Sequence, residues 1–157
     1  MVIWITGLPG SGKTTIAKQL LERLSSEKST PIHLDGDELR VLFGSSIGYS
    51  LAERRKLASQ YSRLCKLLSE QGHIVVCSCV ALFHDVHKWN RDNINNYIEI
   101  FLHVPLAELL KRDQKHLYSQ ALSGEISNVL GVDIEPEYPM NPDCVIENYD
   151  AITVDKS

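Results

Sequence analysis

A glycine-rich segment near the N-terminus constrains the fold more than any other feature of the chain. Residues 7–14 read Gly-Leu-Pro-Gly-Ser-Gly-Lys-Thr, which matches the phosphate-binding loop pattern G-x-x-x-x-G-K-[ST]. The run before it, Val2–Thr6, is rich in β-branched residues, and apolar residues recur at helical spacing from Thr14 to Leu24. A strand, this loop and a helix, in that order, are typical of an α/β protein with a parallel sheet.

The residue types in this loop suit an anionic ligand. Glycines let backbone N–H groups close around phosphate oxygens, and the helix that starts here adds the positive end of its dipole. We expect Lys13 to reach the β- and γ-phosphates of ATP and the Thr14 hydroxyl to hold Mg²⁺. The alternative is a glycine-rich turn without a ligand, and the complete pattern in its complete context argues against it. ATP and Mg²⁺ are therefore the expected cofactors.

Two carboxylates follow the second predicted strand. Pro31–Leu34 reads as that strand, and Asp35-Gly36-Asp37 ends it. The C-terminal ends of parallel strands lie at the same edge of a sheet, so both carboxylates should face the phosphate-binding loop. One would hold Mg²⁺ through water and the other would accept a proton from an attacking hydroxyl, and the pattern leaves open which residue does which. The alternative is a turn that caps a helix, since Asp favours both positions.

The rest of the chain continues the alternation of strands and helices. Cys77 and Cys79, in an apolar run, are interpreted as core-packing thiols, because no second cysteine pair exists to complete a zinc site. The alternation predicts a parallel sheet with helices on both faces. The expected elements are a helix over 51–71, a strand over 73–80, a short helical or irregular piece over 89–95, a strand over 97–104, a helix over 106–113, a polar segment over 115–133, and short strands over 143–147 and 152–154.

Composition narrows the classes of function. The chain has 157 residues and a formal net charge of -4, which fits one domain over residues 1–157 and argues against an electrostatic nucleic-acid binder. No apolar run approaches the ~18 residues of a membrane span, and no basic residues precede the first apolar run as they would in a signal peptide. We therefore expect a cytoplasmic protein that binds neither nucleic acid nor a membrane.

Several motifs occur together and in order along roughly residues 2–146. They are Gly-Leu-Pro-Gly-Ser-Gly-Lys-Thr-Thr (7–15), Leu-Asp-Gly-Asp-Glu-Leu-Arg (34–40), Gly-Tyr-Ser (48–50), Arg-Asp-Gln-Lys-His-Leu-Tyr (112–118), Gly-Glu-Ile (124–126), Gly-Val-Asp (131–133) and Glu-x-Pro (137–139). As a set they resemble the adenylyl-sulfate kinase family, which phosphorylates the ribose 3′-hydroxyl of adenylyl sulfate with ATP. The phosphate-binding loop alone is generic, whereas the segment 112–126 is far more specific.

The resemblance implies a fold, a site and an assembly. The fold is a P-loop kinase of the nucleotide-kinase type, usually a homodimer, with a lid over about residues 113–135. The small-molecule nucleotide acceptor and ATP would meet at Lys13, Asp35 and Asp37, the implied catalytic residues. The other residues implied to contact ATP are Gly7, Gly10, Ser11, Gly12, Thr14, Thr15 and Arg112, and those implied to hold Mg²⁺ are Thr14 and Asp35. The acceptor would be bound by Arg40, Arg54 and Tyr49, whose ring would stack on the base. Lys115 would contact the phosphates that lie between ATP and the acceptor.

The departures from the family pattern fall in the acceptor half. Leu57 stands where the family has asparagine, and Val129 stands where it has a second base-stacking phenylalanine. The family's Ser-Pro-Tyr-Arg reads Ala-Leu-Phe-His over 81–84, which removes a serine credited with a phosphoserine role and an arginine near the acceptor. Phe83 is the side chain expected to fill in for the lost aromatic wall.

Three functions follow from this comparison. The first is a kinase with an altered acceptor pocket that prefers cytidine diphosphoramidate, the acceptor of a family branch found in capsule-modification clusters, because a valine in place of an aromatic wall suits a smaller pyrimidine. The second is an ordinary adenylyl-sulfate kinase of sulfate assimilation. The third is a nucleotide-binding module without transfer activity, against which the presence of Asp37 and Arg40 argues.

Overall fold

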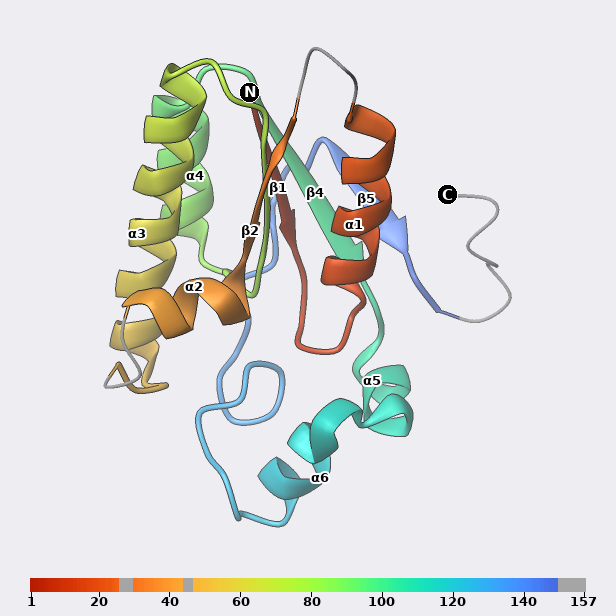
Figure 1. Cartoon of the computed structure of the whole chain (residues 1–157). Coiled ribbons are helices and arrows are strands. Elements are labelled where there is room, and N and C mark those ends of the chain that lie inside the picture. The colour runs from red at the N-terminus through yellow and green to blue at the C-terminus, as the bar shows by residue number, and fades with distance from the viewer. Residues whose placement is uncertain (26–29, 44–46, 150–157) are drawn as a thin grey trace.

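The computed structural model describes residues 1–25, 30–43 and 47–149 and contains a parallel sheet flanked by helices (Figure 1). The strands are β1 (Val2–Thr6), β2 (Ile32–Asp35), β3 (Val75–Cys79), β4 (Tyr97–His103) and β5 (Cys144–Glu147). Their order across the sheet is β2-β3-β1-β4-β5, and every neighbouring pair is parallel. The predicted α/β class is therefore confirmed, and all five strands end at the same edge of the sheet.

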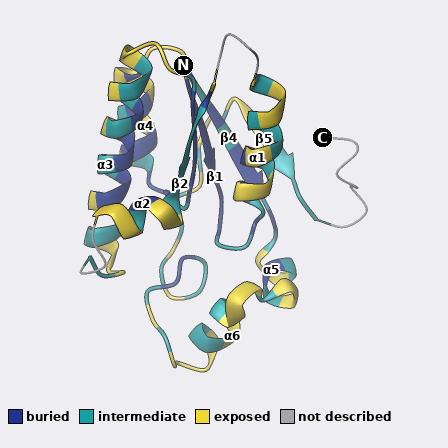
Figure 2. Ribbon diagram, viewed as in Figure 1, coloured by how far each residue is buried: buried dark blue, intermediate teal, exposed yellow. Residues whose placement is uncertain are grey.

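Helices cover both faces of this sheet. The helices are α1 (Lys13–Leu24), α2 (Gly36–Phe43), α3 (Leu51–Glu70), α4 (His84–Asn93), α5 (Leu106–Arg112) and α6 (Leu117–Leu122), with a 3-10 turn, η1, over Gln114–His116. Side chains alternate along β1, so that Val2 and Trp4 pack with residues of α3 and α4, while Ile3 and Ile5 pack with Ala17 of α1. Figure 2 shows the consequence, a sheet buried between α1 on one face and α3 and α4 on the other.

A further apolar cluster lies beyond the C-terminal edge of the sheet. It joins Leu8, which follows β1, to Leu109 of α5, Tyr118 of α6 and Leu130 of the segment after α6. Helices α2, α5 and α6 gather at this edge (Figure 1). The same edge therefore carries the phosphate-binding loop, the acidic pair and the segment predicted as a lid.

The structure corrects three element predictions. Residues 36–43 form α2, a helix that the sequence prediction did not include, because Leu39 is the one buried residue of this short helix and gives little periodicity. Helix α4 begins at His84, five positions before the predicted piece. The sequence prediction missed this start because His87 and Asn90 occupy buried positions where apolar residues would normally stand. The polar segment contains α6, and the strand predicted over 152–154 lies outside the described residues. Among the helices of the described ranges, none has the length and apolar character to cross a membrane.

The buried thiols follow the prediction. Cys65, Cys77 and Cys79 are buried and free, and the sulfur atoms of Cys77 and Cys79 lie 3.9 Å apart. In the described ranges, His, Cys, Asp and Glu side chains form no group of three that could hold a metal ion. The thiols of β3 are therefore part of the core between the sheet and α3.

Candidate active site

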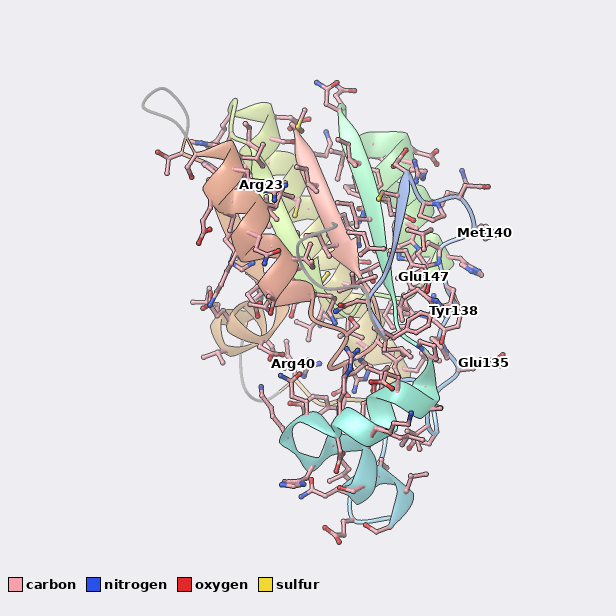
Figure 3. All side chains as sticks on the ribbon, turned by 90° about the vertical axis from the view of Figure 1, so that its right-hand side faces the viewer. Arg23, Arg40, Glu135, Tyr138, Met140 and Glu147 are labelled. Atoms are coloured by element: carbon pink, nitrogen blue, oxygen red, sulfur yellow. The ribbon has the colours of Figure 1, made fainter. Side chains whose placement is uncertain are left out.

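A pocket of about 440 Å³ opens at the C-terminal edge of the sheet. Its wall combines the phosphate-binding loop, the end of β2, α2, the start of α3 and the segment after α5. Figure 3 shows Arg40 at the end of the molecule that carries α5 and α6. Of the residues that the sequence proposed for the site, the pocket brings together Gly10, Gly12, Lys13, Thr14, Thr15, Asp35, Asp37, Arg40, Tyr49, Arg54 and Lys115.

Two glycines fix the path of the loop. A Cβ at Gly7 would lie 2.5 Å from the Leu102 carbonyl oxygen, so only glycine lets the loop leave β1 this close to β4. Gly12 has φ 94° just before α1, and a Cβ there would lie 2.8 Å from the Asn148 amide. Gly7 and the fully buried Ser11 lie behind the pocket wall and shape the loop from there.

Lys13 is held in a buried position at the first turn of α1. Its Nζ donates to the Leu8 carbonyl oxygen at 2.8 Å and lies 3.5 Å from Ser11 Oγ. Burial lowers the pKa of Lys13 to about 8, against the opposing influence of Cys79, Asp37 and Asp35. An anion arriving in the pocket would favour the charged form of this amine, which is what phosphate binding requires.

Asp35 and Thr14 meet at the centre of the pocket. Thr14 Oγ1 donates to Asp35 Oδ2 at 2.8 Å, and Ser78 Oγ donates to the same oxygen at 3.2 Å. Burial alone would raise the pKa of Asp35, but these hydrogen bonds and one from the Asp37 N–H outweigh it and hold the pKa below its usual range. Asp35 is therefore a carboxylate at neutral pH, with oxygens placed beside the Thr14 hydroxyl.

Asp37 and Lys115 face each other across the mouth of the pocket. Asp37 lies in the first turn of α2, and its side chain is 88% exposed. Lys115 Nζ, from the segment after α5, lies 3.5 Å from Asp37 Oδ2. A carboxylate and an amine are thus exposed at the opening of the pocket, and neither side chain packs in the core.

Two arginines lie against the ring of Tyr49. The guanidinium carbon of Arg40 lies 4.0 Å from the ring centroid, and that of Arg54 lies 5.2 Å from it. Arg40 donates to the carbonyl oxygens of Ile47 and Gly48, and Arg54 donates to that of Tyr49 at 2.9 Å. These bonds hold two cations and one aromatic face together at one end of the pocket.

Three predicted features lie outside the pocket wall. Phe83 is 1% exposed, and its ring packs in the core below Arg55, because α4 begins immediately after it. The expectation that Phe83 forms a wall of the pocket is therefore wrong. Val129 is buried in the cluster with Leu8 and contributes no surface to the pocket. Arg112 donates to the Asn148 carbonyl oxygen at 2.7 Å, beside the phosphate-binding loop.

The pocket also contains residues that the sequence alone did not assign to it. Ser78 stands opposite Asp35 in the parallel register, and a hydroxyl near the end of an apolar strand was a signal that could have found it. Tyr61 donates its hydroxyl to the Gly36 carbonyl oxygen at 3.3 Å, and nothing in its helical spacing distinguished it from a core residue. The others are Gly36, Ala58, Cys79, Val80, Gln114 and Leu117. Pro9 of the phosphate-binding loop and Leu57, which the family resemblance had already located at the site, also line the pocket.

Comparison with known proteins agrees with this geometry. The family model for adenylylsulphate kinase matches residues 1–147. A protein from Campylobacter jejuni subsp. jejuni serotype O:2, described as cytidine diphosphoramidate kinase, is 43% identical over 94% of this chain and 85% of its own length. The adenylyl-sulfate kinase of Pseudomonas aeruginosa is 38% identical over 93% of this chain and 76% of its own length.

The structural comparison leads to the same family. The adenylyl-sulfate kinase CysC of Mycobacterium tuberculosis, solved in complex with AMPPNP and adenylyl sulfate, superposes with a TM-score of 0.85 at 31% identity, over 93% of this chain and 87% of that one. The two chains therefore share the fold described above, a parallel sheet flanked by helices. Sequence, fold and pocket thus agree, and the chain belongs to the adenylylsulphate kinase family of P-loop phosphotransferases.

Proposed function

We propose that this chain transfers the γ-phosphoryl group of ATP to the ribose 3′-hydroxyl of a nucleotide, and that its preferred acceptor is cytidine diphosphoramidate. The observation that carries the transfer reaction is the meeting of Lys13, Thr14 and Asp35 in one pocket, with Asp37 at its mouth. The observation that carries the choice of acceptor is the 43% identity to the C. jejuni relative, against 38% to the P. aeruginosa one.

The residues at the centre of the pocket fit Mg²⁺. This ion prefers oxygen ligands and is usually held by one or two protein groups together with substrate phosphates and water. Thr14 Oγ1 and Asp35 Oδ2, which lie 2.8 Å apart, provide such oxygens. When bound, Mg²⁺ would neutralise charge on the phosphates of ATP.

The roles of the other residues follow from their positions. Lys13 would bind the β- and γ-phosphates from inside the loop, and Lys115 would approach them from the opposite side of the pocket. Asp37, exposed at the mouth, would accept the proton of the attacking ribose hydroxyl. Phosphoryl transfer depends mainly on positioning and charge stabilisation, which is what these groups supply.

The acceptor end of the pocket supports a small base. Tyr49 offers one aromatic face, and Arg40 and Arg54 offer cations for a phosphate-linked group beside the ribose. Leu57 contributes an apolar surface, and Val129 is withdrawn into the cluster under the lid. With one aromatic wall in place of two, a purine would lose part of its stacking energy. A pyrimidine has a smaller face to stack and would lose less of that energy.

Adenylyl sulfate is the second candidate acceptor. It is favoured by the TM-score of 0.85 to the M. tuberculosis enzyme that was solved with adenylyl sulfate. An assay of ADP release with a panel of nucleotide acceptors, followed by phosphorus NMR of the product, tests both candidates. ATP binding without acceptor-dependent ADP release would instead identify a nucleotide-binding module without transfer activity.

The remaining expectations are proposals of the same kind. We propose one domain over residues 1–157, with the segment 113–135 acting as the lid over ATP. We also propose a homodimer, which light scattering at several protein concentrations would test. The free state of Cys65, Cys77, Cys79 and Cys144 fits a reducing compartment such as the cytoplasm.

A further inference from the structure

The phosphate-binding loop can act as an anion site only if its peptide groups are correctly oriented. In a trans peptide the carbonyl oxygen of one residue and the N–H of the next point in opposite directions. A donor that captures a carbonyl oxygen on the protein side of the loop therefore turns the following N–H toward the pocket. Gly10 and Gly12 line the pocket, and within the described part of the chain their N–H groups have no hydrogen-bond acceptor.

The first such donor comes from the lid segment. Tyr118 Oη donates to the Pro9 carbonyl oxygen at 2.7 Å, from a side chain that is 1% exposed. Asp113 Oδ1 accepts the Tyr118 N–H at 3.0 Å, so the start of α6 is itself fixed. The peptide between Pro9 and Gly10 is thereby held with its carbonyl toward α6 and the Gly10 N–H directed the other way.

The second donor comes from the segment after β5. Asn148 Nδ2 donates to the Ser11 carbonyl oxygen at 2.9 Å, which holds the peptide between Ser11 and Gly12. The Asn148 N–H donates to the His103 carbonyl oxygen at the end of β4, and the Asn148 carbonyl oxygen accepts from Arg112. Asn148 thus connects the loop to the sheet and to Arg112, which the resemblance implies as a contact with ATP.

We propose that Tyr118 and Asn148 are positioning residues for ATP, which hold the Pro9 and Ser11 carbonyls so that the Gly10 and Gly12 N–H groups face the phosphates. The inference rests on the proposed function, since it needs a triphosphate in the loop. Neither residue touches the ligand in this account. Because Tyr118 belongs to the segment predicted as the lid, docking of that segment and preparation of the phosphate site are one event.

The test removes each donor alone and measures ATP·Mg²⁺ binding by calorimetry. Tyr118→Phe deletes one oxygen, and Asn148→Ala deletes the amide. We expect the Kd of ATP to rise about 3- to 10-fold in each, the range of one neutral hydrogen bond. The KM for ATP should rise in parallel while kcat stays within about twofold of wild type, as expected for a contact that helps ground state and transition state alike.

Matched controls separate positioning from general stability. Tyr97→Phe removes a half-buried hydroxyl that donates to Glu99, and Asn93→Ala removes an amide that donates to the Trp89 carbonyl oxygen, both away from the loop. All four variants should lower the Tm, and the controls should leave the Kd of ATP within about 1.5-fold of wild type. If Tyr118→Phe does not fold, Asn148→Ala carries the test.

The outcomes distinguish the inference from the function on which it rests. Binding of ATP by the wild type, with Kd values for Tyr118→Phe and Asn148→Ala no higher than those of the controls, would overturn the positioning role and leave the kinase proposal intact. Failure of the wild type to bind ATP·Mg²⁺ would overturn both. A rise in Kd confined to the two loop-holding variants is the result that supports the inference.

Discussion

The ATP half and the acceptor half of the pocket are built in different ways. The phosphate-binding loop is wedged against the sheet, with Gly7 in contact with the Leu102 backbone and Lys13 buried. In the acceptor half, the Asp37 side chain is 88% exposed and Tyr49 is 54% exposed. A side chain added at Gly7 or Gly12 would therefore disturb the backbone that forms the first half, whereas substitution of exposed side chains such as Asp37 and Tyr49 should leave the fold in place.

The acceptor half nevertheless has one fixed point, at the start of α3. Ser50 and Glu53 form a capping box, and Glu53 also accepts the Gly48 N–H at 3.0 Å. A Cβ at Gly48 would lie 2.5 Å from the Glu53 carboxylate, so a side chain there would disturb this contact. The loop that carries Tyr49 is therefore held by its backbone, while the Tyr49 side chain stays 54% exposed beside Arg40 and Arg54.

Asp37→Asn should produce the largest effect on turnover. If Asp37 accepts the proton of the acceptor hydroxyl, kcat should fall by roughly 10²–10⁴, the usual range for a general base. The Kd of ATP and the Tm should change little, because the side chain is exposed and packs against no core residue. Steady-state kinetics and calorimetry on the same preparation provide the check. Loss of ATP binding together with kcat would assign Asp37 to the metal site and leave Asp35 as the better candidate for the base.

Lys13→Ala should follow, with a loss of roughly 10²–10³ in kcat, as is typical when one charge-stabilising group is removed. The fold should persist, because the path of the loop depends on its glycines and on contacts with Leu102 and Asn148. Circular dichroism and the assay of ADP release test the two parts separately. Near-wild-type turnover by a folded variant would refute the assignment of the ATP half.

Tyr49→Ala addresses the other half alone. Stacking of a base on an aromatic ring is worth about 1–3 kcal/mol, so kcat/KM for the acceptor should fall roughly tenfold to a hundredfold. The KM for ATP should remain within about twofold, since Tyr49 lies on the arginines of the acceptor end. An equal loss for both substrates would show that the two halves are not separable in the way described.

The dependence of ATP binding on pH offers a smaller and graded test. The pKa of Lys13 is lowered to about 8 in the unliganded protein, so the amine is charged below pH 8 and must regain a proton to bind phosphate above it. The Kd of ATP should therefore rise about tenfold per pH unit above pH 8. Calorimetry in two buffers of different ionisation enthalpy would detect the proton uptake, and a flat profile between pH 7 and 9.5 would contradict the assignment.

The same group should affect stability with the opposite sign. In the unfolded chain Lys13 keeps its proton up to its ordinary pKa of 10.5, so between pH 8 and 10.5 the unfolded state binds more protons than the folded state. The contribution of Lys13 to the free energy of unfolding should therefore increase with pH in this range, by about 1.4 kcal/mol per unit. Comparison of urea unfolding at pH 8 and 9.5 for wild type and Lys13→Ala isolates this contribution.

The two halves also differ in how far the sequence could predict them. The strand, loop and helix around Lys13 are fixed by local requirements of backbone geometry, and the structure reproduces them. Asp35 was predictable for a similar reason, because it ends a parallel strand beside the loop. Ser78 reaches the pocket through the register of β2 with β3, and Tyr61 reaches it through the packing of α3. The spacing of residues along the sequence predicts neither that register nor that packing.

Phe83 shows the limit of motif comparison. A motif gives the position of a residue in the chain, but the direction of its side chain depends on the backbone around it. Here α4 begins at His84, which turns the Phe83 ring into the core, while the Arg55 guanidinium lies 4.8 Å from its centroid. The placement of aromatic walls in the acceptor half therefore required the structure.

The identity of the acceptor tests whether an intact ATP half works with an altered acceptor half in this enzyme. The measurement is kcat/KM for cytidine diphosphoramidate and for adenylyl sulfate, side by side, at saturating ATP·Mg²⁺. We expect a higher kcat/KM for the cytidine compound, with the phosphoryl group on the ribose 3′-hydroxyl of either product. A value for adenylyl sulfate that exceeds the cytidine value by more than about tenfold, the size of one lost stacking contact, would contradict it.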